Sequence, residues 1–113
     1  RNRRAAVEIA NQRLEALRAA AFEAITPSPA TPNYSTYYLS LDAIAGWQIS
    51  QADPGETVLI NGAQLPIVTT VQYMDADEGT SSYDYLRLAV RVQFRRGLDE
   101  YVVLETRRAP EQL

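Results

Sequence analysis

The sequence RNRRAAVEIANQRLEALRAAAFEAI (residues 1–25) decides the fold, because its apolar residues follow a helical repeat. Steps of three and four residues place them along one face of an α-helix. The predicted packing positions on this face are Val7, Ala10, Leu14, Leu17, Ala21 and Ile25. Three prolines in TPSPATPN (residues 26–33) then disfavour helical backbone. We therefore expect one helix over residues 1–25, followed by an extended connector over 26–33.

The start of this helix lacks the usual signals. No Ser, Thr or Asp caps it and no acid lies in its first turn. Arg1, Arg3 and Arg4 carry a charge that a helix N-terminus disfavours. A helix with a clear end and no clear start suggests that it was cut from a longer one. We expect residues 1–6 to protrude and to meet a neighbouring molecule or lipid.

The composition limits the chemistry available to the chain. Its 113 residues fit one domain, and 46% of them are apolar, enough for a core. There is no Cys, His or Lys, which removes thiolate and imidazole chemistry and Schiff bases. Carboxylates, hydroxyls and tyrosines remain, and no motif isolates a carboxylate pair around Asp42 or Asp53. We expect a protein that is not an enzyme and that holds no cofactor.

The charge is mildly negative and unevenly placed. The net charge is −3, and residues 26–86 contain seven acids and no base. The flanking segments, 1–25 and 87–113, each have more Arg than acidic residues. Nucleic-acid surfaces normally need a clustered basic face, so we expect no direct nucleic-acid binding.

Residues 34–113 show strand patterns rather than helical ones. Asn61-Gly62 predicts a tight turn between two strands, and Pro66 places the start of the second at a sheet edge. Residues 44–50 are consistent with either a strand or an irregular turn. The predicted strands span residues 35–41, 44–50, 57–60, 65–74, 85–96 and 100–108.

The clearest strand pattern lies in residues 85–96, where apolar and polar residues alternate. With residues 100–108 it predicts an antiparallel hairpin in which Arg87, Arg91 and Arg95 lie near Glu100 or Glu105. The apolar face of this hairpin gives the helix a surface to cover, so we expect an α+β fold with the N-terminal helix on an antiparallel sheet. Its predicted helix-facing residues are Leu88, Val90, Val92 and Phe94.

Two stretches carry a family resemblance. AAVEIANQRLEALRAAAFEAI (residues 5–25), with its QRLEALRA phrase and Pro-rich break, resembles the soluble part of type IV pilin-like proteins, meaning minor pilins and type II secretion pseudopilins. VTTVQYMDADEGTSSYDYLRLAVRVQF (residues 68–94) is similar to the strand, acidic loop and long alternating strand of that branch, and LETR (residues 104–107) to its final strand. Residues 34–66 have no counterpart in the resemblance.

The resemblance implies a filament subunit. Such proteins carry an upstream apolar stretch, preceded by a short basic leader that a prepilin peptidase cuts. That stretch anchors the subunit in the inner membrane and later packs in the filament core. The implied location is the bacterial cell envelope, with the present domain in the periplasm or outside the cell. The implied partners are other pilin or pseudopilin subunits and, through the upstream segment, the inner membrane.

Two further features are candidate sites. Asp75, Asp77, Glu78 and Asp84 supply hard oxygen ligands for calcium within one loop, although a solvated acidic loop explains them as well. Tyr37, Tyr38 and Trp47 are candidates for a recognition patch, with strand packing as the alternative. The other function class left open is a soluble binding or oligomerisation module whose helix packs against a partner.

Overall fold

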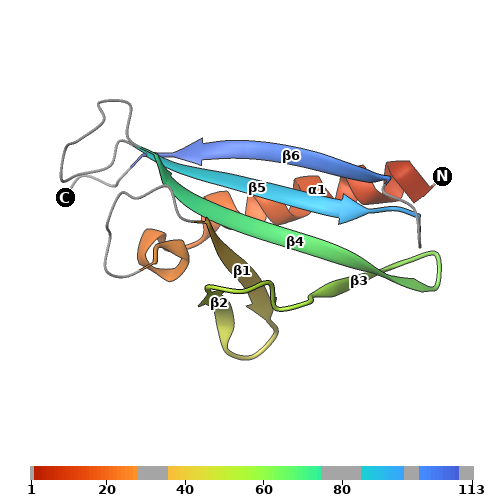
Figure 1. Cartoon of the computed structure of the whole chain (residues 1–113), viewed down its shortest axis with the longest axis horizontal. Helices are drawn as coiled ribbons and strands as arrows, with labels where there is room; N and C mark the ends of the chain where they lie inside the picture. Colours follow the sequence, from red (N-terminus) through yellow and green to blue (C-terminus); the bar gives the residue numbers. More distant parts are fainter. Residues whose placement is uncertain (1, 28–35, 75–84, 96–99, 110–113) are drawn as a thin grey trace.

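The computed structural model describes residues 2–27, 36–74, 85–95 and 100–109. In these residues one α-helix packs on an antiparallel sheet (Figure 1), so the predicted α+β class is confirmed. The elements are α1 (Asn2–Ala19), the 3₁₀ helix η1 (Phe22–Ile25), β1 (Thr36–Asp42), β2 (Gly46–Ser50), β3 (Thr57–Ile60), β4 (Ala63–Met74), β5 (Tyr85–Gln93) and β6 (Tyr101–Arg108).

The sheet has the order β2-β1-β4-β5-β6, and β3 pairs with the beginning of β4. One edge of β4 therefore pairs with two strands, with β3 at residues 63–66 and with β1 at residues 69–72. Asn61 and Gly62 join β3 to β4 with φ angles of 49° and 83°, the left-handed backbone that a two-residue hairpin turn requires. The predicted tight turn is confirmed.

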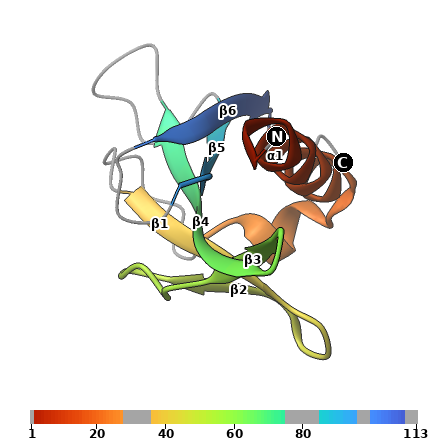
Figure 2. The same ribbon diagram turned by 90° about the vertical axis from the view of Figure 1, so that its right-hand side faces the viewer.

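Alternation along the strands gives the sheet one apolar face toward the helices. On β5 the buried residues are Leu86, Leu88, Val90 and Val92. In an end-on view α1 lies beside β5 and β6, while β2 and β3 curve away below it (Figure 2). The residues that α1 buries against the sheet are Ala6, Ala10, Leu14 and Leu17. Full burial of each leucine contributes about 1.5–3 kcal/mol.

The helix ends earlier than its apolar repeat predicts. α1 stops at Ala19, and η1 then turns Phe22 and Ile25 into the core. Arg108 of β6 donates from Nη1 to the carbonyl oxygens of Leu17 at 2.9 Å and Ala20 at 2.8 Å. These bonds satisfy carbonyls that a helix C-terminus leaves free. The helix predicted over residues 1–25 is therefore wrong beyond Ala19.

One predicted packing position on this segment is also wrong. Ala21 is exposed, because the turn between α1 and η1 breaks the helical repeat before it reaches that residue. Val7 and Phe94 are half-buried and pack against the edge of the core. The side chain of Phe22, outside the predicted stripe, is buried instead.

The first turns of α1 lie against the sheet. Ala6 is fully buried, and Asn2 donates from Nδ2 to the carbonyl oxygen of Phe94 at 3.3 Å. Asn61, in the turn between β3 and β4, donates to Asn2 Oδ1. The expectation that residues 1–6 protrude is therefore wrong for Asn2 and Ala6, because one asparagine joins the start of the helix to two parts of the sheet.

Candidate functional site

The face of the sheet opposite α1 contains an open groove of about 350 Å³. We call it the outer-face groove; Figure 1 is viewed from this side. Outward-facing residues of four neighbouring strands line it, and Asp53, from the connection between β2 and β3, closes one side. The lining residues used below are Tyr38, Val68, Ala89, Arg91, Tyr101 and Val103.

Arginines on this face are held by aromatic rings and by a carboxylate. The guanidinium of Arg91 lies 5.0 Å from the ring centre of Tyr101, within cation–π range. Arg87 forms a salt bridge with Glu105 across β5 and β6, as the sequence predicts. The hydrogen bond and charge of Glu105 raise the pKa of Arg87 above its ordinary value. Glu105 balances the charge of Arg87, and Arg91 places a cation in the lining of the groove.

A second cluster joins α1 to the segment before β3. Arg13 donates from Nη1 and Nη2 to the two carboxylate oxygens of Glu56, at 2.9 and 2.7 Å. The two side chains are only 11% and 17% exposed. Arg13 also donates to Thr69 Oγ1 at 3.4 Å and lies 5.6 Å from the ring centre of Trp47. This cluster joins the helix to the sheet. Its charged groups, Arg13 and Glu56, bond to each other.

The turn between β1 and β2 presents an aliphatic side chain to solvent. Asp42 Oδ1 accepts hydrogen bonds from the backbone N–H groups of Ala45 and Ile44, both at 2.8 Å. These two bonds lower the pKa of Asp42. Gly46 ends the turn at φ 82°, and Ile44 at its apex is 98% exposed. We call residues 42–46 the Ile44 tip.

Asp53 also stabilises a turn, since its Oδ1 accepts from the N–H of Gly55 at 2.9 Å. Gly55 has φ 74°, a left-handed conformation that suits glycine. Asp42 and Asp53 are thus each engaged in their own turn, which favours a structural role for them over an acid–base pair.

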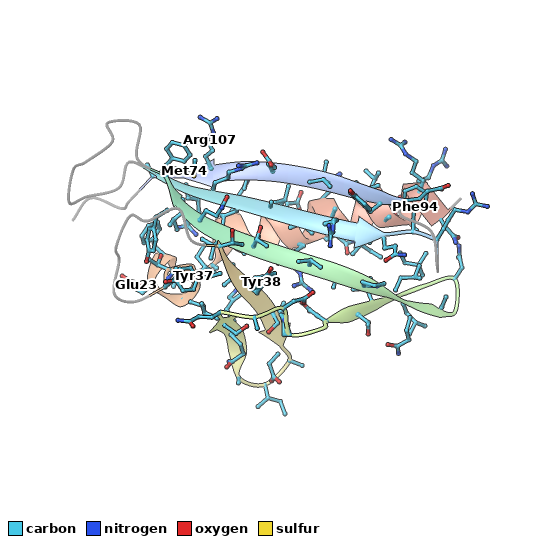
Figure 3. All side chains as sticks on the ribbon, in the orientation of Figure 1. Glu23, Tyr37, Tyr38, Met74, Phe94 and Arg107 are labelled. Carbon is cyan, nitrogen blue, oxygen red and sulfur yellow. The ribbon has the colours of Figure 1, made fainter. Side chains whose placement is uncertain are left out.

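The predicted recognition patch is divided between the two faces of the sheet. Tyr37 pairs with buried Val71 and packs, with Trp47, against the core on the helix side. Tyr38 lines the outer-face groove, and Figure 3 shows it in front of the sheet while Tyr37 lies beside η1. The patch of Tyr37, Tyr38 and Trp47 is therefore wrong as a single surface, and only Tyr38 belongs to the groove.

The predicted calcium loop falls outside the described residues, since Asp75, Asp77, Glu78 and Asp84 all lie in residues 75–84. Within residues 2–27, 36–74, 85–95 and 100–109, no group of three or more acidic side chains is placed to hold a metal ion. The same residues include no helix with the length and hydropathy needed to span a bilayer.

Comparisons with models of protein families, with curated proteins and with solved structures gave no match to this chain. Function therefore has to be argued from the geometry of the groove, the Ile44 tip and the helix.

Proposed function

We propose that this chain is a structural subunit of a type IV pilus or type II secretion-like filament, of the minor pilin or pseudopilin kind. The observation that carries the proposal is the direction of α1. The molecule measures 45 × 30 × 22 Å, and α1 runs along its length with its N-terminal end at one extremity (Figure 1). A helix that continued upstream would leave the body without meeting the sheet.

The charge at this end suits an anchored subunit. The first turn of α1 contains no acid, and Arg3 and Arg4 are exposed there. Arginine side chains extend their charge toward lipid headgroups while their stems lie along apolar surface. Such an end is compatible with an inner-membrane segment directly upstream and with the domain in the periplasm or outside the cell.

The proposed role is in assembly rather than catalysis. In a filament the subunit would assist initiation, tip formation, adhesion, secretion or DNA uptake, with other pilins or pseudopilins as its partners. The absence of Cys, His and Lys and the turn roles of Asp42 and Asp53 support this view.

The gene upstream of Arg1 tests the proposal. It should encode about 20 apolar residues, the length that spans a bilayer. A short basic leader ending in a small residue should precede them, with a Glu a few positions into the apolar stretch. The complete protein should fractionate with the inner membrane and shorten when the prepilin peptidase is present. A start codon or a polar domain upstream would end the proposal.

The alternative of a module whose helix packs against a partner receives less support. The apolar stripe of α1 is already buried, with Leu14 and Leu17 at 3% and 0% exposure inside their own domain. A partner that took up this stripe would have to displace the sheet.

A further inference from the structure

The Ile44 tip has the properties of a docking element. Its aliphatic side chain is almost fully exposed, and the Asp42 hydrogen bonds hold the turn in one conformation. Burial of exposed apolar surface is favourable, and a preformed turn loses little conformational entropy when it docks. The β1–β2 hairpin also projects away from the rest of the sheet (Figure 1).

The outer-face groove has the complementary shape and polarity. Val68, Ala89 and Val103 form apolar floor, and the rings of Tyr38 and Tyr101 add apolar area at its sides. Val103, the third residue of the edge strand β6, is 48% exposed. The groove thus has an apolar floor beside the polar side chains of Asp53, Thr70 and Arg91, and it is large enough to accept an aliphatic side chain.

The tip and the groove carry one pair of opposite charges, Asp42 at the tip and Arg91 in the groove lining. The described segment 36–74 bears acids and no base, and Asp42 lies directly beside Ile44. Arg91 lines the groove, whereas the charge of Arg87, on the same face of β5, is balanced by its salt bridge with Glu105. Asp53 is the acid that faces the groove, and it accepts the turn hydrogen bond from Gly55. An incoming Asp42 would therefore be directed toward Arg91.

We propose that the Ile44 tip of one copy inserts into the outer-face groove of a second copy, with Ile44 against Val103 and Asp42 beside Arg91. The contact rests on the proposed function, because a repeating contact is what a filament requires. Tip and groove are different surfaces of one molecule, so the contact is head-to-tail and can repeat along an open assembly.

Disulfide trapping tests this contact, since residues 1–113 contain no native cysteine to interfere. Ile44→Cys and Val103→Cys are placed in separate copies, co-expressed from the complete gene in its own host and oxidised. We expect a covalent dimer with the two copies together and none with either alone. The control is Leu59→Cys with Val103→Cys, because Leu59 is an exposed aliphatic residue of β3 outside the tip.

Charge reversal gives a second measurement on the same pair. Arg91→Glu in the Val103→Cys copy should lower the dimer yield about tenfold, and adding Ala43→Arg to the Ile44→Cys copy should restore it. Three results would overturn the contact. They are a dimer yield from the Leu59→Cys control equal to that from Ile44→Cys, a dimer from Ile44→Cys alone, and no dimer in any combination. The upstream sequence and membrane fractionation report on the filament role independently, so the two proposals can fail separately.

Discussion

The described ion pairs differ most in how far water reaches them. Arg13 and Glu56 form a two-pronged pair at 11% and 17% exposure, whereas Arg87 and Glu105 are 43% and 46% exposed. Hydrogen bonds to charged groups away from water contribute about 1.5–3 kcal/mol. Exposed pairs contribute about 0–1 kcal/mol, since water and salt screen them. The two pairs therefore allow the contribution of a partly buried ion pair to stability to be compared with that of an exposed one.

Glu56→Gln should lower the free energy of unfolding by about 1–3 kcal/mol, because it leaves Arg13 charged beside a neutral amide. Glu105→Gln is the control and should cost about 0–1 kcal/mol. Urea unfolding followed by far-UV circular dichroism measures both, because that signal reports on the helix and the sheet together. Equal losses in the two variants would show that the Arg13–Glu56 pair contributes no more than a surface pair.

The acid dependence of stability should include a contribution from Asp42. Its pKa lies below the ordinary value of 3.8 in the folded state, because the N–H groups of Ala45 and Ile44 stabilise the carboxylate. A lowered folded-state pKa means that the contribution is fully present above the unfolded-state pKa and is lost as the pH falls through the folded-state value.

We therefore expect Asp42→Ala to be destabilised relative to the wild type at pH 6, and the difference to shrink as the pH falls below about 3.8. Chemical denaturation at a series of pH values measures this difference. A difference that stays constant across that range would mean that the turn does not depend on the ionised carboxylate.

At the scale of elements, the packing of α1 depends on a few apolar side chains. Leu17 is fully buried between the helix and the sheet, whereas Arg3 is exposed. Leu17→Ala should lower the free energy of unfolding by about 2–5 kcal/mol, the range for truncation of a buried leucine. Arg3→Ala should change it by less than about 0.5 kcal/mol. A tolerated Leu17→Ala in thermal and urea unfolding would contradict the observed docking of α1.

The end of α1 illustrates what the sequence pattern can and cannot predict. The repeat through Leu14 and Leu17 identifies the helix and its buried face, because periodicity is a local property. Beyond the end at Ala19, the carbonyl oxygen of Ala20 accepts from Arg108, which is 88 residues further along the chain. The ion pair of Arg13 with Glu56 likewise joins residues 43 positions apart. Neither contact has a local signal, so tertiary structure is needed to find it.

The recognition patch shows a different limit. Successive residues of a strand point to opposite faces, so Tyr37 and Tyr38 cannot share one surface once β1 is extended. Strand parity alone could have separated them. Strand parity could not have predicted the outer-face groove. The groove depends on the strand order β1-β4-β5-β6, which brings together segments distant in the sequence.

Arg108 should be measurable as a capping residue of α1. Arg108→Gln removes a cation from the helix C-terminus and the bonds to the Leu17 and Ala20 carbonyls. We expect a loss of about 1–3 kcal/mol in unfolding free energy and faster amide exchange in the last turn of α1. Arg107→Gln is the control, because Arg107 is exposed and lies over Tyr85 on the other face. Equal effects of the two changes would refute the capping role.

At the scale of the whole molecule, the elements differ in how many neighbouring elements they pair with or pack against. β4 and β5 each pair with strands on both sides, and α1 covers β5 and β6. Among the strands that the structure describes, β2 pairs only with β1 and forms one edge of the sheet. Local opening has a lower free energy where fewer buried contacts are lost. The β1–β2 hairpin should therefore open before the helix and the central strands separate.

Native-state hydrogen exchange should resolve this order. Amides of β2 that bond to β1 should exchange at least tenfold faster than those of β5, because exchange in β2 needs only the hairpin to open. Leu17→Ala should speed exchange in β5 and β6 through the loss of global stability and leave β2 nearly unchanged. NMR exchange rates at a single pH measure all three strands together. If the amides of β2 and β5 were equally protected, and if Leu17→Ala speeded exchange in both strands, the molecule would open only as a whole.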